Sequence, residues 1–228
     1  APSLAPEGAY LVTGGLGGVL QQVARWLVAR GARRLVLTSR RGLAAASQQQ
    51  LDFVAELQAA GAAVEVAAVD VCDKEAMRGV LGAAAPVAGI VHGAGVMTME
   101  TLRTLGRDGL AATLAPKVAG SLNLHALSSE LGLALDFFVM FSSISAVWGS
   151  NQLAHYSAAN GFCDALAAHR RSLGLTALSV DWGLLAEGGM SAHEDAKFAA
   201  AMGLRPLSVP EYTAALGSLI AADAAHKI

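Results

Sequence analysis

The chain has 228 residues, of which 54% are hydrophobic and only 15% are charged, and its formal net charge is -2. Such a composition excludes disorder as the main state, and the charge offers no basic surface for nucleic acid or anionic lipid. The apolar stretches are interrupted before the roughly 20 residues that a membrane span needs, and no signal-peptide pattern begins the chain. We therefore expect one large, well-buried domain over residues 1–228.

The two cysteines, Cys72 and Cys163, are far apart and have no Cys/His ligand spacing. A disulfide framework or a metal site is therefore not expected, and a reducing cytoplasm is the predicted location.

Short β-rich apolar runs alternate with alanine-rich helical patterns along the chain. Strands are expected in "AYLVT", "RRLVLTS", "VEVAAVD", "VAGIVH", "LDFFVMFSS" and "TALSVDW", with helices between them, including helices from Lys74, from about Asp108 and from about Leu153. This alternation predicts an α/β fold, a Rossmann-like doubly wound parallel sheet with helices on both faces. Residues 185–208 are expected to form a helical lid, followed by a last helix from about Pro210 and the start of a final strand in "HKI".

The first strand is followed by a glycine-rich turn that leads into the first helix, with glycines at Gly14, Gly15, Gly17 and Gly18. Glycines allow a tight turn and close backbone approach to a pyrophosphate at a helix N-terminus. The alternative is a glycine turn without a ligand. The third glycine position of the pattern holds Leu20, which either shifts the helix or weakens cofactor binding.

The second strand ends in Ser39, Arg40 and Arg41, where a site for NAD would carry an acidic residue. A guanidinium can pair with a phosphate through two hydrogen bonds, so the pattern favours NADPH over NADH. The alternative is that the arginines belong to a solvated turn. After the third strand, Asp70 and Val71 are expected near the adenine, although Asp70 could instead cap the next helix.

A tyrosine in "YSAAN" has the helical position of a reductase acid, but Asn160 stands where Tyr-x-x-x-Lys would have its lysine. The four lysines of the chain are Lys74, Lys117, Lys197 and Lys227. Of these, Lys117 lies in the helix expected to pack beside the helix of Tyr156. We therefore expect it to supply the missing cation.

The motifs "TGG.G", "LTSRRG", "HGAG", "LAPKV.G..NLH", "FSS", "Y..AN" and "WG", in this order, resemble a polyketide synthase ketoreductase domain, a specialised short-chain dehydrogenase/reductase. In that family the lysine and the asparagine exchange places. The resemblance implies a catalytic tetrad of Lys117, Ser143, Tyr156 and Asn160, and a cofactor site that also includes Thr13, Gly93, Ala94 and Gly95. Taken singly, Ser143 could be a strand-end hydroxyl and Asn160 a helix-surface amide.

The implied chemistry is hydride transfer from NADPH to the β-ketone of an acyl thioester, with Tyr156 as proton donor. Lys117 would make the phenol's proton mobile, Ser143 would polarise the carbonyl, and Asn160 would hold the lysine or a water relay.

The resemblance also implies a stereochemical class. Met97, Thr98 and Met99 stand where one class has Leu-Asp-Asp, and Trp148, eight residues before Tyr156, is the mark of the other class, the A-type that gives an L-configured β-hydroxyl. Leu153 replaces the histidine of the subtype that handles an epimerised α-carbon. His155 and Met190 are expected at the substrate entrance. Trp148 could instead simply cover the core.

The implied partners are an acyl carrier protein bearing the substrate on phosphopantetheine and the other domains of a multidomain synthase. The family's preceding structural subdomain has no counterpart in these residues. The main alternative is a reductively silent domain with a scaffold or α-epimerising role, supported only by Leu20.

Overall fold

The computed structural model describes residues 4–188, 203–222 and 226–227. Its seven strands, all parallel to their neighbours, are β1 (Ala9–Thr13), β2 (Arg34–Ser39), β3 (Ala63–Ala68), β4 (Val87–His92), β5 (Phe137–Ser143), β6 (Leu178–Trp182) and β7 (His226–Lys227). They form one sheet in the order β3-β2-β1-β4-β5-β6-β7. This is the doubly wound order expected from the sequence, with β1 and β4 meeting at the point where the order reverses.

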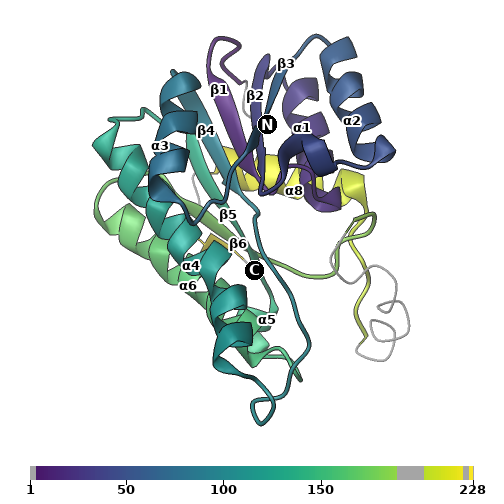
Figure 1. Ribbon diagram of the computed structural model, residues 1–228, viewed down its shortest axis with the longest axis vertical. Helices are drawn as coiled ribbons and strands as arrows, with labels where there is room; N and C mark the ends of the chain where they lie inside the picture. Colours follow the sequence, from purple (N-terminus) through teal and green to yellow (C-terminus); the bar gives the residue numbers. More distant parts are fainter. Residues whose placement is uncertain (1–3, 189–202, 223–225, 228) are drawn as a thin grey trace.

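The helices are α1 (Gly18–Ala29), α2 (Gln48–Ala59), α3 (Lys74–Ala83), α4 (Arg107–Glu130), α5 (Ser145–Trp148), α6 (Ala154–Ser172) and α8 (Val209–Ala221), with a 3-10 turn η1 (Gly42–Ala45) after β2. They cover both faces of the sheet (Figure 1). The apolar side chains of α1, α2 and α8 share one core cluster with one face of the sheet, and those of α3, α4 and α6 share a second cluster with the other. The predicted fold class is confirmed.

The central strands explain why the sheet is buried on both faces. β1, β4 and β6 are buried at every position, and β5 at all but its last residue, Ser143. Continuous apolar runs of this kind suit parallel strands covered by helices on both sides. β3 alternates between half-buried and exposed residues because it lies at the edge of the sheet.

α4 and α6 lie side by side on one face of the sheet and bring distant parts of the sequence together (Figure 1). α4 contains Pro116 in its interior, which removes one helical hydrogen bond. α6 begins after the short helix α5 that follows β5. This packing puts Lys117 of α4 and Tyr156 of α6 under the same end of the sheet.

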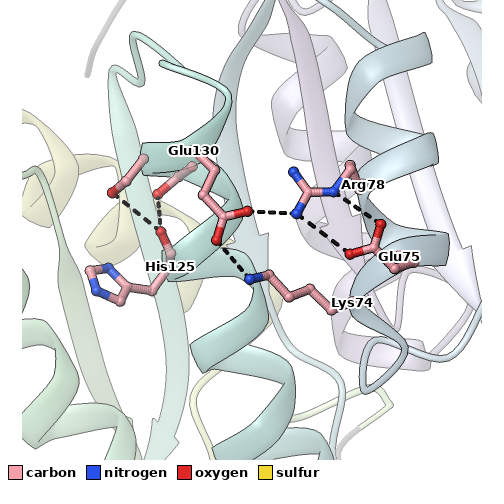
Figure 2. Close-up of polar contacts among 7 residues, drawn as sticks. Lys74, Glu75, Arg78, His125 and Glu130 are labelled. Carbon is pink, nitrogen blue, oxygen red and sulfur yellow. Dashed lines mark hydrogen bonds and ion pairs between the residues drawn. The ribbon is translucent and has the colours of Figure 1, made fainter.

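A network of exposed ion pairs links α3 to α4 (Figure 2). Glu130, the last residue of α4, accepts hydrogen bonds from Lys74 Nζ and Arg78, both at 2.6 Å, and Arg78 also pairs with Glu75. The pairing with both cations lowers the pKa of Glu130. Exposed ion pairs contribute little to stability. The network is a surface contact between α3 and α4, away from the cavity described below.

The two ends of the connection between β6 and α8 lie side by side. Leu185 forms a parallel bridge with Leu207, and the N–H of Leu207 donates to Leu184 O at 2.8 Å. The interior of the predicted lid, residues 189–202 with Met190, lies outside the described residues. None of the described helices combines the length and apolarity that crossing a membrane requires.

Candidate active site

A cavity of about 1760 Å³ lies at the carboxyl ends of the strands. Its lining comes from the glycine turn after β1, the end of β2, the loops after β3 and β4, α4, the end of β5, α5, the start of α6 and the segment after β6. Open α/β sheets bind ligands at this edge, and here the cavity extends across the switch point between β1 and β4.

The glycine turn is built for close backbone packing at Gly14. Its φ is +71°, and a Cβ there would lie 3.1 Å from the backbone of Ala94, so only glycine fits without strain. Gly14, Gly17 and Gly18 line the cavity. Gly15 does not line it: its N–H donates to Thr38 O at 3.2 Å and it packs against Leu37.

The N-terminus of α1 faces this turn without a side chain to satisfy it. Gly17 is the N-cap and makes no side-chain capping bond, and no acidic residue stands in the first turn. A helix N-terminus without a side-chain cap from the described residues, together with the helix dipole, suits an anionic group such as a pyrophosphate.

Leu20 packs against the turn after β4. It is buried, lines the cavity, and packs against Gly93 in the turn after β4, where a Cβ at residue 93 would lie 2.6 Å from its side chain. The small residue that the pattern expects at position 20 is thus supplied from across the turn by Gly93.

The expected adenosine side of the cavity is lined by Ser39, Arg40 and Arg41, together with Asp70 and Val71. Both arginines are exposed. Asp70 accepts the N–H of Cys72 at 2.9 Å, while the cap of α3 is Asp73, which accepts from Ala76 N at 3.0 Å. Asp70 therefore does not cap the helix, and its carboxylate borders the cavity. 

Cys72, beside it, has a free thiol. Burial and the neighbouring Asp70 raise the pKa of Cys72 to about 11, and Arg40 opposes this shift.

Thr13 and His92 form a buried chain of hydrogen bonds that the sequence did not reveal. His92 Nδ1 lies 2.7 Å from Thr13 Oγ1, which accepts from Ala94 N at 3.3 Å, and His92 Nε2 lies 3.0 Å from Pro116 O. Because a carbonyl only accepts, Nε2 carries the proton and Nδ1 accepts from the threonine. These hydrogen bonds join the turn after β4 to the helical turn before Lys117, and Thr13 itself does not line the cavity.

Lys117 lies almost wholly buried between α4 and β5. Its ammonium donates to Phe141 O, and Gly95 leaves room for its side chain, since a Cβ at residue 95 would lie 3.0 Å from Lys117 Cε. Burial lowers the pKa of Lys117, and Cys163 and Asp164 act in the opposite direction. Gly95, expected only at the cofactor, thus also makes space for the lysine.

Tyr156 and Ser143 reach the cavity from α6 and β5. Burial raises the pKa of the Tyr156 phenol, while the side chains of Asn160 and Ser143 lower it. Ser143 Oγ accepts from Ser145 N at 3.3 Å and from Ser145 Oγ at 3.1 Å, which leaves its own proton available for another acceptor. Three of the four predicted catalytic residues, Lys117, Ser143 and Tyr156, therefore line one cavity.

Asn160 is placed differently from the expectation. It is fully buried and is not among the lining residues, and its Nδ2 donates to Tyr156 O at 2.8 Å. Its Oδ1 has no hydrogen-bond partner within the described part of the chain. In this arrangement it holds the helical turn of Tyr156, and its described hydrogen bond is not to Lys117.

Some of the predicted substrate residues line the cavity, and His155 does not. Met97, Trp148 and Leu153 line the cavity, and Trp148 is 57% exposed, so it does not cover the core. His155 is buried with 2% exposure and does not line the cavity, contrary to the expectation. Its Nε2 is 3.1 Å from Thr98 Oγ1 in the loop after β4.

Comparison with known proteins places this site in a family. The sequence model of the family described as "KR domain" matches residues 8–187. The chain is 43% identical over 206 residues to the pikromycin polyketide synthase component PikAIII of Streptomyces venezuelae, covering 89% of this chain and 13% of that protein. It is 47% identical over 193 residues to the polyketide synthase GfsB of Streptomyces halstedii, covering 83% of this chain and 3% of that protein.

Solved ketoreductases have the same fold. The ketoreductase from the first module of phoslactomycin biosynthesis in Streptomyces sp. HK803 has a TM-score of 0.88 at 41% identity, covering 96% of this chain and 51% of that chain. A structure described as A1-type has a TM-score of 0.88 at 38% identity, covering all of this chain and 50% of that one, and a C2-type structure has 0.87 at 31%, covering all of this chain and 49% of that one. The chain thus spans about half the length of these solved chains and a small part of the curated relatives. It belongs to the family of ketoreductase (KR) domains of modular polyketide synthases.

Proposed function

We propose that this chain reduces the β-ketone of an acyl thioester with NADPH, the acyl chain being presented on the phosphopantetheine of an acyl carrier protein. The observation that carries the proposal is the convergence of Tyr156, Ser143 and Lys117 on a cavity that also contains two exposed arginines. The relatives are polyketide synthases, in which such a domain works beside others.

The residues fit NADPH at both ends of the cavity. The uncapped N-terminus of α1 and the turn at Gly14 would hold the pyrophosphate, and Arg40 and Arg41 would pair with the phosphate on the adenosine ribose. When bound, NADPH supplies the hydride.

The protein's own residues manage the proton and the developing charge. Ser143, whose oxygen already accepts two hydrogen bonds, would turn its proton to the ketone oxygen and polarise it. The Tyr156 hydroxyl would give its proton to the same oxygen as negative charge forms there.

The raised pKa of Tyr156 keeps the phenol protonated before reaction, as a general acid requires. Lys117 would act through the field of its ammonium and through its contact with Phe141 on β5.

We further propose the A-type outcome, an L-configured β-hydroxyl. Thr98 and Met99 stand where the other class carries acidic residues, and Met97, Met99 and Trp148 line the cavity. Leu153, also at the cavity, supports an unepimerised or unsubstituted α-carbon.

One incubation tests these points together. The protein is given NADPH or NADH and a racemic 2-methyl-3-ketoacyl thioester, cofactor consumption is followed, and the alcohol is analysed on a chiral column. Tyr156→Phe should lose roughly 100- to 10,000-fold in rate. Tyr10→Phe is the matched control, because it removes a hydroxyl that bonds Ala5 O, away from the cavity. Wild-type binding of NADPH without consumption would favour the silent alternative.

A further inference from the structure

The connection between β4 and α4, residues 93–106, contains no helix or strand. Loops of this length without secondary structure are uncommon in compact domains and are usually functional. Its first half borders the cavity through Met97 and Met99, while Thr98 between them is not among the lining residues. Val96 lines the cavity as well, so within residues 96–100, called the strip below, Val96, Met97 and Met99 border the cavity and Thr98 does not.

Two hydrogen bonds fasten this strip to the residues around the start of α6. Thr98 Oγ1 lies 3.1 Å from His155 Nε2, and the N–H of Glu100 donates to Gln152 O at 2.9 Å. Gln152 has a φ of +61°, so the turn that offers this carbonyl is locally strained. The strip is thus tied directly to the turn that precedes Tyr156.

A third contact holds the far end of the strip. The Glu100 carboxylate lies over the first turn of α4, where a Cβ at Gly109 would be 2.9 Å from Glu100 Oε1. An anionic side chain is favoured at a helix N-terminus. The strip therefore lies against the start of α4, which carries Lys117, and is hydrogen-bonded around the start of α6, which carries Tyr156.

His155 is suited to act as a fixed anchor. It is 2% exposed, one residue before Tyr156, and its Nδ1 has no hydrogen-bond partner in the described ranges. Among the described residues, the His155 side chain is thus held by its burial and by its hydrogen bond with Thr98. A shift of Thr98 would move Met97 and Met99 relative to Tyr156.

We propose that Thr98 and His155 are a positioning pair. Their hydrogen bond holds Met97 and Met99 in place at the cavity, and so sets the orientation in which the β-ketoacyl chain meets Tyr156. The proposal rests on the proposed ketone reduction. Thr98→Val removes the hydroxyl while keeping the side-chain shape, and Thr98→Ser keeps the hydroxyl. Thr101→Val is the matched control, because the hydrogen bonds of the Thr101 hydroxyl to described residues stay within its own turn, to Thr104 at 3.0 Å between the two hydroxyl oxygens.

The first measurement is amide hydrogen exchange of residues 96–100, which does not depend on turnover. Loss of one ordinary hydrogen bond corresponds to roughly fivefold in the opening equilibrium, so exchange should rise about fivefold in Thr98→Val and stay near wild type in Thr98→Ser and Thr101→Val. Equal exchange in all variants would overturn the anchoring, even if the wild type proved inactive.

The second measurement is the ratio of alcohol stereoisomers together with KM and kcat. Thr98→Val should raise the minor isomer and the KM for the ketone by roughly fivefold, with NADPH affinity unchanged. An active wild type whose isomer ratio is unchanged in Thr98→Val would overturn the role in substrate orientation. An inactive wild type would refute the proposed reduction and leave hydrogen exchange to decide the anchoring.

Discussion

The side chain of Leu20 fills the space into which a side chain on Gly93 would project. A Cβ on Gly93 would approach Leu20 Cδ2 to 2.6 Å, and Leu20 is itself buried. Leu20, at the third position of the glycine pattern, thus has room because residue 93, 73 positions later in the sequence, is a glycine.

This relationship predicts a coupled pair of substitutions. Gly93→Ala should lower the free energy of unfolding by about 1–3 kcal/mol, because the added methyl group overpacks the contact, and should weaken NADPH binding. Adding Leu20→Ala should recover part of both losses. Urea unfolding and fluorescence titration with NADPH measure the two effects, and purely additive effects of the substitutions would contradict the shared space.

From Arg40 and Arg41 we predict a preference for NADPH over NADH. Replacing either with alanine should raise the KM for NADPH by roughly 10- to 100-fold, because a charged hydrogen-bond partner of the phosphate is lost. The KM for NADH should change little.

Arg30→Ala serves as the control. Arg30 follows α1 at the end opposite the glycine turn and does not line the cavity. If the Arg40 and Arg41 variants affect NADH and NADPH equally, the arginines do not select the phosphate.

The fold and the chemistry-bearing positions were predictable because they depend on periodicity and order. Alternating strands and helices fix the sheet, and the carboxyl ends of its strands gather the motifs. The position of Lys117 followed from the order of α4 and α6, since adjacent crossover helices pack together. 

Side-chain direction was less accessible from sequence. Thr13, Gly15 and Asn160 belong to the right segments but do not line the cavity. Whether a residue at a strand end or on a helix faces a ligand depends on register and local twist, which no motif encodes. The hydrogen bonds of His92 and of Thr98 were missed because each joins segments far apart in the chain, and only "HGAG" contained a visible signal for the first.

His92 predicts a specific dependence of stability on pH. Burial and the nearby Lys117 lower its pKa to about 3, whereas the unfolded side chain titrates near its ordinary value of about 6.5. Between these values the unfolded state binds more protons than the folded state. The free energy of unfolding should therefore fall as the pH decreases through this window, by at most about 1.4 kcal/mol per pH unit from this residue.

His92→Gln isolates the contribution of His92. Glu56 and Glu211 also have lowered pKa values, so their protonation in acid lowers the free energy of unfolding as well. This contribution is the same in the wild type and in the His92→Gln variant. The variant should show a shallower slope of unfolding free energy against pH between about 4 and 6.5. Parallel slopes for wild type and variant would show that the buried histidine does not resist protonation.

Lys117 and Lys74 are a matched pair for testing which cation serves Tyr156. Both make an ammonium hydrogen bond, but Lys117 is buried at the cavity whereas Lys74 pairs with Glu130 on the surface (Figure 2). Methionine keeps an unbranched apolar side chain and removes the charge. Lys117→Met should reduce the rate of ketone reduction by roughly 100-fold or more with NADPH still bound, because it removes the ammonium whose field is proposed to act on the phenol. Lys74→Met should leave turnover unchanged, and a comparable loss in both variants would mean that the cation acts through the fold.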